Sequence, residues 1–135
     1  MIRVWIEGKP VPQSRPRFTK QGHAYEAKAS KEYKKAVAIA AKEAMAGQEP
    51  LAGAIRVRMT AYFDIPKSWP KKMQQQAMVG ELLPILRPDL DNLAKSVLDG
   101  MSGIVFTDDS QITDLEINKR YTGDGAGVVA WIGKL

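Results

Sequence analysis

The amino-acid sequence predicts an α+β fold: a single domain over residues 1–135 with one mostly antiparallel, mixed sheet whose helices pack on one face. Three observations lead to this prediction. The chain has 135 residues, of which 44% are hydrophobic, and this size is typical of one domain. Some segments alternate apolar and polar residues as strands do, whereas others repeat apolar residues every three or four positions as helices do. Short turn signals join many of these segments, which favours antiparallel neighbours in the sheet.

The first half of the chain is predicted to form a strand, a basic loop, a helix and a second strand. Residues 2–7 alternate like a half-buried strand, whereas residues 13–22 have neither period, so we expect a basic loop there. A helix is predicted over residues 30–46. Its apolar face consists of Tyr33, Val37, Ala40, Ala41 and Ala44. The clearest strand pattern covers residues 55–63, and Pro66 closes it.

Two further helices are expected next. Ser68 is placed to cap a short helix that runs to Met78, with Gly80 at its end. A longer amphipathic helix begins after Pro88. Its apolar stripe consists of Leu90, Leu93, Val97, Leu98 and Met101.

The last part of the chain is predicted to be mainly strand. Residues 104–106 look extended, and a strand is expected over residues 112–121. The glycine-rich turn at residues 122–125 predicts a hairpin into a final strand at residues 126–132.

Composition limits the chemistry that the chain can perform. It has no cysteine and one histidine, which excludes a disulfide framework, cysteine-ligated metals, a thiol nucleophile and sites with two or three histidines. Twenty Lys and Arg against fifteen Asp and Glu give a net charge of +5, which suits a polyanionic partner such as nucleic acid. No segment approaches the roughly 20 apolar residues that span a bilayer, and Glu7 stands where a signal peptide would be apolar. We therefore expect a cytoplasmic protein without a membrane partner.

Three carboxylates are candidates for one site. Asp89 and Asp91 begin the longer helix, and Asp109 follows it, next to Asp108. The helix is about 20 Å long, and an extended return segment to Asp109 spans up to roughly 23–25 Å. If that segment runs antiparallel to the helix, Asp109 arrives beside the other two. Carboxylates gathered in this way take up protons or bind a cation, and oxygen ligands favour Mg²⁺ or Mn²⁺.

Lys95 lies one helical turn after Asp91, on the same flank of the helix. Its ammonium group could stabilise charge on a phosphate, orient a water or pair with Asp91. The spacing also leaves a purely structural interpretation open. In that case Asp89 is an N-cap, Asp91 favours the helix dipole, Lys95 is a salt-bridge partner, and Asp108 and Asp109 form a turn.

Two rival acidic motifs were compared with this stretch. A calcium loop that begins at Asp89 would need glycine at its sixth position and glutamate at its twelfth, but the twelfth residue is Gly100, so this motif is excluded. In a phosphatase with an Asp-x-Asp nucleophile, this motif normally follows an apolar parallel strand. Here Pro84, Arg87 and Pro88 interrupt the approach, which disfavours that alternative.

The stretch from Arg87 to Gly100 contains Asp-Leu-Asp-Asn-Leu-Ala-Lys, and Asp-Asp-Ser-Gln follows at residues 108–111. Together the two motifs resemble the RusA family of Holliday-junction resolvases, found in prophages and bacteria. Pro-Gln-Ser-Arg-Pro-Arg at residues 12–17 and Lys119 extend the resemblance over most of the chain. Each motif alone would be a weak signal, whereas the two at this spacing are specific.

The resemblance implies a homodimeric, Mg²⁺-dependent endonuclease that nicks two strands of a four-way DNA junction symmetrically, in recombination and repair. It assigns the catalytic and metal-binding acids to Asp89, Asp91 and Asp109, and the catalytic lysine to Lys95. Asp108 matches the neighbouring acid, to which no definite role is assigned. Mn²⁺ would be a substitute for Mg²⁺. Symmetric nicking of a two-fold junction also requires two equivalent active sites, which favours a homodimer.

The expected DNA contacts are basic residues outside the acidic motif. The better-known member of the family has a basic run before its first aspartate, whereas this chain has only Arg87 there, so we expect other cations to contribute. Arg15, Arg17 and Lys20, interleaved with aromatic residues, are the best candidates for gripping the DNA backbone. The resemblance adds Lys119. Two alternatives remain: a catalytically silent structure-specific DNA-binding protein, and a metal-dependent phosphatase.

Overall fold

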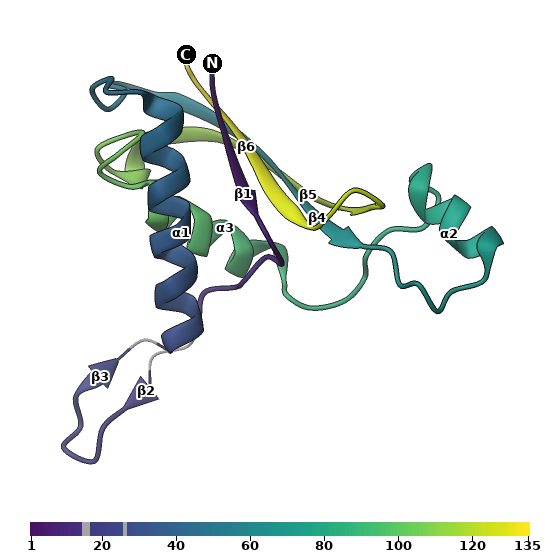
Figure 1. Ribbon diagram of the computed structural model, residues 1–135. Coiled ribbons are helices and arrows are strands. Elements are labelled where there is room, and N and C mark those ends of the chain that lie inside the picture. Colours follow the sequence, from purple (N-terminus) through teal and green to yellow (C-terminus); the bar gives the residue numbers. More distant parts are fainter. Residues whose placement is uncertain (15–16, 26) are drawn as a thin grey trace.

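The computed structural model describes residues 1–14, 17–25 and 27–135. Its centre is a four-stranded sheet in the order β1-β6-β4-β5 (Figure 1). The strands are β1 (Ile2–Glu7), β4 (Ile55–Asp64), β5 (Ile112–Thr122) and β6 (Gly127–Lys134). β6 pairs antiparallel with both β1 and β4, whereas β4 and β5 are parallel. The predicted α+β class with a mostly antiparallel, mixed sheet is therefore confirmed.

The predicted hairpin at residues 122–125 is wrong, because β4 lies between β5 and β6 in the sheet. The burial of the strands explains this order. Alternate residues of β4 from Ile55 to Phe63 are buried, as expected of an inner strand, whereas β5 has no buried residue and contains charged side chains at Asp114 and Glu116. Such a strand suits the edge of a sheet. The turn therefore joins two strands that are not partners.

Two helices cover one face of the sheet. α1 (Lys28–Met45) and α3 (Leu90–Met101) pack against each other on that face (Figure 1). Both amphipathic helices were predicted, and their apolar stripes enclose the core with the inward residues of the strands. They approach closely at Gly100, where a Cβ atom would lie 2.6 Å from the Cβ of Val37. No helix in the described residues is both long and apolar enough to cross a membrane.

The third helix, α2 (Lys71–Met78), lies beyond the end of the sheet (Figure 1). Ser68 does not cap it, contrary to the prediction; the N-cap is Pro70. A proline disfavours helical backbone at the residue before it, so Trp69 cannot join the helix and α2 starts after the proline. Trp69 instead packs its ring edge-on against Tyr121 of β5, with the ring centroids 5.3 Å apart.

Two short segments also differ from the predictions. The expected basic loop contains a small hairpin of β2 (Arg17–Phe18) and β3 (Ala24–Tyr25), which projects beyond the start of α1 (Figure 1). Two-residue strands are too short to produce an alternating pattern. Residues 104–106 do not form an extended return strand: the backbone N–H groups of Ile104 and Val105 both donate to the carbonyl of Met101 at 3.0 Å. This turn buries Val105 and Phe106 completely in the core.

Candidate active site

The first turn of α3 carries two exposed carboxylates. Asp89 is the N-cap residue, with extended backbone, and its side chain makes no capping hydrogen bond to the helix. Asp91 lies in the first turn, where the partial positive charge of the helix N-terminus stabilises a carboxylate. The expectation that Asp89 is the N-cap is therefore confirmed, and helix capping does not use its carboxylate.

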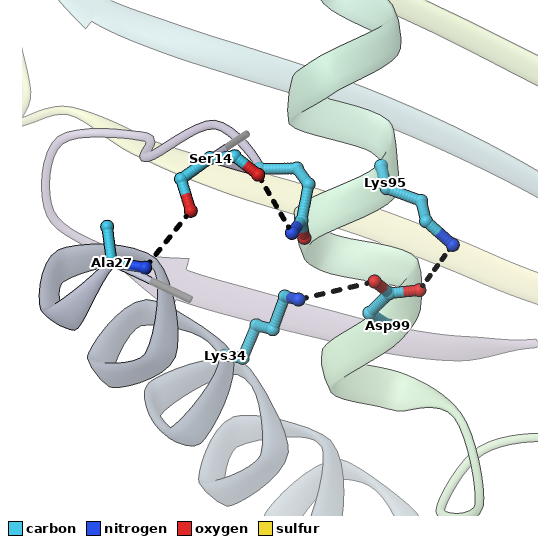
Figure 2. A network of polar contacts seen from close by, with 6 residues as sticks. Ser14, Ala27, Lys34, Lys95 and Asp99 are labelled. Carbon is cyan, nitrogen blue, oxygen red and sulfur yellow. Dashed lines mark hydrogen bonds and ion pairs between the residues drawn. The ribbon is translucent and has the colours of Figure 1, made fainter. Parts of the chain in front are cut away.

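Lys95 pairs with Asp99, not with Asp91. Its Nζ lies 3.0 Å from Oδ1 of Asp99, and Nζ of Lys34 on α1 lies 3.3 Å from Oδ2 of the same carboxylate (Figure 2). Asp99 therefore bridges two ammonium groups from two helices. The sequence analysis did not single out Asp99 or Lys34. The four-residue spacing of Lys95 and Asp99 in a helix could have predicted their ion pair. The ion pair between Asp99 and Lys34 of α1 depends on the tertiary fold, so the sequence pattern could not predict it.

The electrostatic environment of Lys95 extends to the acidic corner after α3. Its pKa is raised above the usual value, chiefly by the hydrogen bond and the negative charge of Asp99, and further by the charges of Asp109 and Asp108. The helix and the corner are thus close enough to interact electrostatically. The prediction that Asp109 arrives beside Asp89 and Asp91 is a different one, and the electrostatic effect of the corner on Lys95 does not test it.

The corner itself has a well-defined local structure. Residues Asp109–Gln111 form a single 3-10 turn, and the Asp108 carboxylate caps it by accepting a hydrogen bond from the Ser110 N–H at 3.0 Å. This bond lowers the pKa of Asp108. Asp108 is therefore occupied by its own turn, whereas Asp109, also exposed, does not serve as the cap.

Gln111 fastens this corner to the rest of the molecule. Its Oε1 accepts from the backbone N–H groups of Thr107 and Asp108 at 2.8 and 3.0 Å. Its Nε2 donates to the carbonyls of Leu51 and Gly53 at 2.8 and 3.0 Å. The side chain thus ties the turn that carries Asp109 to the loop before β4. This explains the glutamine of the Asp-Asp-x-Gln motif, for which the sequence analysis offered no role.

The candidate ligands were also compared with the needs of a magnesium ion. The described residues contain no group of three or more histidine or acidic side chains close enough to hold a metal by themselves. Exposed aspartates nevertheless supply the hard oxygen atoms that Mg²⁺ prefers, and Mg²⁺ usually binds one or two carboxylates together with waters and substrate phosphates. These carboxylates therefore suit an ion that is bound by the protein and a phosphate together. They suit less well an ion that is enclosed by protein ligands alone.

An open groove of about 490 Å³ lies beside these residues, between α3 and the edge strand β5. Asp91 and Lys95 line it together with apolar side chains of both elements, among them Leu115 and Ile117. The catalytic candidates on α3 therefore face an accessible surface. The predicted antiparallel return strand is not what brings Asp109 toward Lys95; the buried turn at residues 104–106 carries the chain to the start of β5 instead.

The expected DNA contacts fall into two groups. Lys20 is exposed in the turn of the β2–β3 hairpin, two residues after Phe18, which is 67% exposed. Arg17 belongs to β2, although only its backbone is described, and Arg15 lies outside the described residues. The second group lies beside α3. Arg87 is exposed just before the cis peptide bond to Pro88, whereas Lys119 donates hydrogen bonds to two backbone carbonyls of the same loop.

The root of the hairpin is anchored near the acidic end of α3. The Gln13 N–H donates to the carbonyl of Asn92 in the first turn of that helix at 3.0 Å. Ser14 Oγ accepts from the Ala27 N–H at 3.3 Å, which ties the segment to the start of α1 (Figure 2). The segment that leads into the hairpin therefore contacts the first turn of α3, the helix that carries Asp91.

Comparison with known proteins agrees with these features. The family model described as Endodeoxyribonuclease RusA matches residues 7–132. The chain is also 32% identical over 126 residues to the uncharacterized protein YqaN of Bacillus subtilis (strain 168), covering 90% of this chain and 88% of that protein. The family match includes both acidic motifs, the β2–β3 hairpin, α3 and β5. The chain therefore belongs to the RusA endodeoxyribonuclease family.

Proposed function

We propose that this chain is a Mg²⁺-dependent endonuclease that resolves four-way DNA junctions by paired, symmetric nicks as a homodimer, in recombination and repair. One observation carries the proposal beyond family membership. Lys95 of α3 interacts electrostatically with Asp109 and Asp108 and shares a groove with Asp91. A lysine and carboxylates around an open surface are the groups that phosphodiester hydrolysis requires.

In the proposed site, Asp89, Asp91 and Asp109 would hold Mg²⁺ together with waters and the substrate phosphate, with Mn²⁺ as a substitute. When bound, the metal supplies a Lewis acid for the phosphate and lowers the pKa of a water nucleophile. Lys95 contributes a positive charge beside the phosphate, where negative charge increases in the transition state. Asp99 raises the pKa of that ammonium and orients it, and Lys34 pairs with the second oxygen of Asp99.

The proposed DNA contacts add backbone affinity to this chemistry. Arg17 and Lys20 belong to the β2–β3 hairpin, which projects from the body (Figure 1), and Arg87 lies just before Asp89. Arg15, the third proposed contact of this group, lies outside the described residues. Contacts between cations and phosphates provide binding that is independent of sequence and weakens as salt rises. The net charge of +5 supports this part of the proposal.

The test uses labelled four-way junction, linear duplex and single strand, each incubated with and without Mg²⁺. We expect cleavage of the junction at symmetric positions, only with the metal. Asp91→Asn should abolish cleavage and leave junction binding intact or tighter, because it removes a negative charge that repels phosphate but keeps the side-chain volume. Asp124→Asn, in the exposed turn after β5, is the matched control and should cleave normally.

Other results would identify the alternatives. Junction binding without cleavage by the unsubstituted protein would indicate a silent DNA-binding protein. Turnover of a simple aryl phosphate without junction binding would indicate a phosphatase. Normal cleavage by the Asp91→Asn variant would contradict the proposed mechanism.

A further inference from the structure

Lys119 occupies an unusual position for a DNA-contacting lysine. It lies on β5 between Ile117 and Tyr121, two residues that pack against the hydrophobic core. Side chains two residues apart point to the same face of a strand, so Lys119 projects from the helix-covered face of the sheet. It is only partly exposed. An ammonium group in this position needs hydrogen-bond acceptors from the protein itself.

The acceptors are two carbonyls of the loop that leads into α3. Nζ of Lys119 donates to the carbonyl of Leu86 at 2.7 Å and to the carbonyl of Pro88 at 3.0 Å. A lysine has three donors, so one at most remains for a phosphate. Two bonds to carbonyls on either side of Arg87 hold this loop against the edge strand.

The loop ends at Asp89. The Asp89 carbonyl already accepts the first hydrogen bond of α3, from the Leu93 N–H at 3.1 Å, so the helix fixes one side of this residue. Lys119 fixes the other side through the carbonyl of Pro88. The main chain of a proposed metal ligand is thus held between a helix and a lysine from the sheet, 31 positions away in sequence from Pro88.

We propose that Lys119 is a positioning residue of the candidate active site: it fixes the loop at Leu86 and Pro88, and thereby Asp89, and is not a DNA contact. This inference rests on the proposed function for its catalytic consequence. Partners that orient a metal ligand typically change metal affinity or activity by about 10- to 100-fold when they are removed. The loss of Lys119 should therefore affect the use of the metal more than the binding of DNA.

The test compares Lys119→Met, which keeps an unbranched apolar stem but has no donor, with Lys119→Arg, which keeps donors. Lys134→Met, an exposed position on β6, removes the same charge elsewhere in the sheet. For Lys119→Met we expect cleavage about 10- to 100-fold slower, with more Mg²⁺ needed for half-maximal rate. The dependence of metal-free junction binding on salt should be unchanged. Lys119→Arg should restore part of the rate, and Lys134→Met should cleave normally.

A second measurement does not depend on activity. Amide hydrogen exchange of the peptide over residues 82–90 should accelerate in Lys119→Met, and in neither of the other two variants. A DNA-contacting lysine would instead leave this exchange unchanged and reduce the salt slope of junction binding by about one unit; that pair of results overturns the inference. If the unsubstituted protein binds junctions without cutting them, the proposed function and the catalytic role of Lys119 both fail. Faster hydrogen exchange of residues 82–90 in Lys119→Met would then show that Lys119 holds the loop but has no effect on catalysis.

Discussion

Asp99 is the residue that most strongly influences the proposed catalytic lysine. Its carboxylate pairs with the ammonium groups of Lys95 at 3.0 Å and Lys34 at 3.3 Å. The side chain of Asp99 is 26% exposed. The hydrogen bond and charge of Asp99 stabilise the protonated form of Lys95 and raise the pKa of that ammonium. Lys95 therefore stays charged at alkaline pH and loses its proton only as the pH rises through the raised value.

Asp99→Asn should lower the pKa of Lys95, because it removes the carboxylate charge and replaces a charged acceptor with a neutral one. The change is measured by following the side-chain NMR signals of labelled lysine through an alkaline titration. At neutral pH the ammonium stays protonated in either protein, so any fall in cleavage rate there reports its orientation and not its charge. Asp124→Asn is again the control. An unchanged pKa of Lys95 in the Asp99→Asn variant would contradict this account.

The sequence was informative at this scale about residue types and less informative about partners. It identified Asp89, Asp91, Lys95 and Asp109 as a group, because their spacing alone suggested a shared site. It could not assign Lys95 to Asp99 in place of Asp91, since both lie one turn away along the helix. Two of the four side-chain hydrogen bonds of Gln111 are made to a loop about 60 positions earlier in the chain, and no local pattern encodes such a contact.

The packing of α1 against α3 helps to position the candidate site, because α3 carries Asp91 and Lys95. Gly100 lies at the closest approach. A Cβ atom there would lie 2.6 Å from Cβ and 2.7 Å from Cγ1 of Val37, and 3.1 Å from the Lys34 carbonyl. Such contacts are far below van der Waals distance, so a larger residue must push the helices apart.

Gly100→Ala should therefore destabilise the protein, although alanine is the better helix former. The helix propensity gained is about 1 kcal/mol, whereas overpacking a close helix contact typically costs about 1–3 kcal/mol. We expect a lower denaturant midpoint with an unchanged slope, measured by chemical unfolding. Val37→Ala removes Cγ1 but keeps the Cβ, so a double-mutant cycle should recover only part of the loss. An increase in stability on Gly100→Ala alone would show that the two helices can separate at little cost.

Helices and strands with a long repeating pattern of apolar residues could be predicted from the sequence. Elements that are short, or that are set by contacts distant in sequence, could not. The alternation of β4 and the apolar stripe of α3 extend over enough residues to identify a strand and a helix. The β2–β3 hairpin is too short for a period, and the start of α2 depends on the effect of Pro70 on Trp69. The order of strands was also beyond a local pattern, because periodicity shows which face is buried but not which strand is the neighbour.

In the whole molecule, two segments distant in sequence hold the start of α3. The hairpin root bonds to the first turn of α3 through Gln13 and Asn92, and Lys119 on β5 holds the loop that enters the same helix. One protomer thus presents one candidate site. A four-way junction has two-fold symmetry, so paired symmetric nicks require a second, equivalent site from another copy of the chain.

This requirement leads to a prediction about mixed dimers. A dimer of one unsubstituted subunit and one Asp91→Asn subunit, isolated by two different affinity tags, should cut only one strand of each junction. A plasmid with an extruded cruciform separates the outcomes, since paired nicks linearise it and a single nick gives an open circle. The mixed dimer should therefore give open circles, while a dimer of unsubstituted and Asp124→Asn subunits should give linear plasmid. Failure to isolate any doubly tagged species, with or without junction DNA, would contradict the homodimer. Linear product from the mixed Asp91→Asn dimer would instead mean that one active site makes both cuts in turn.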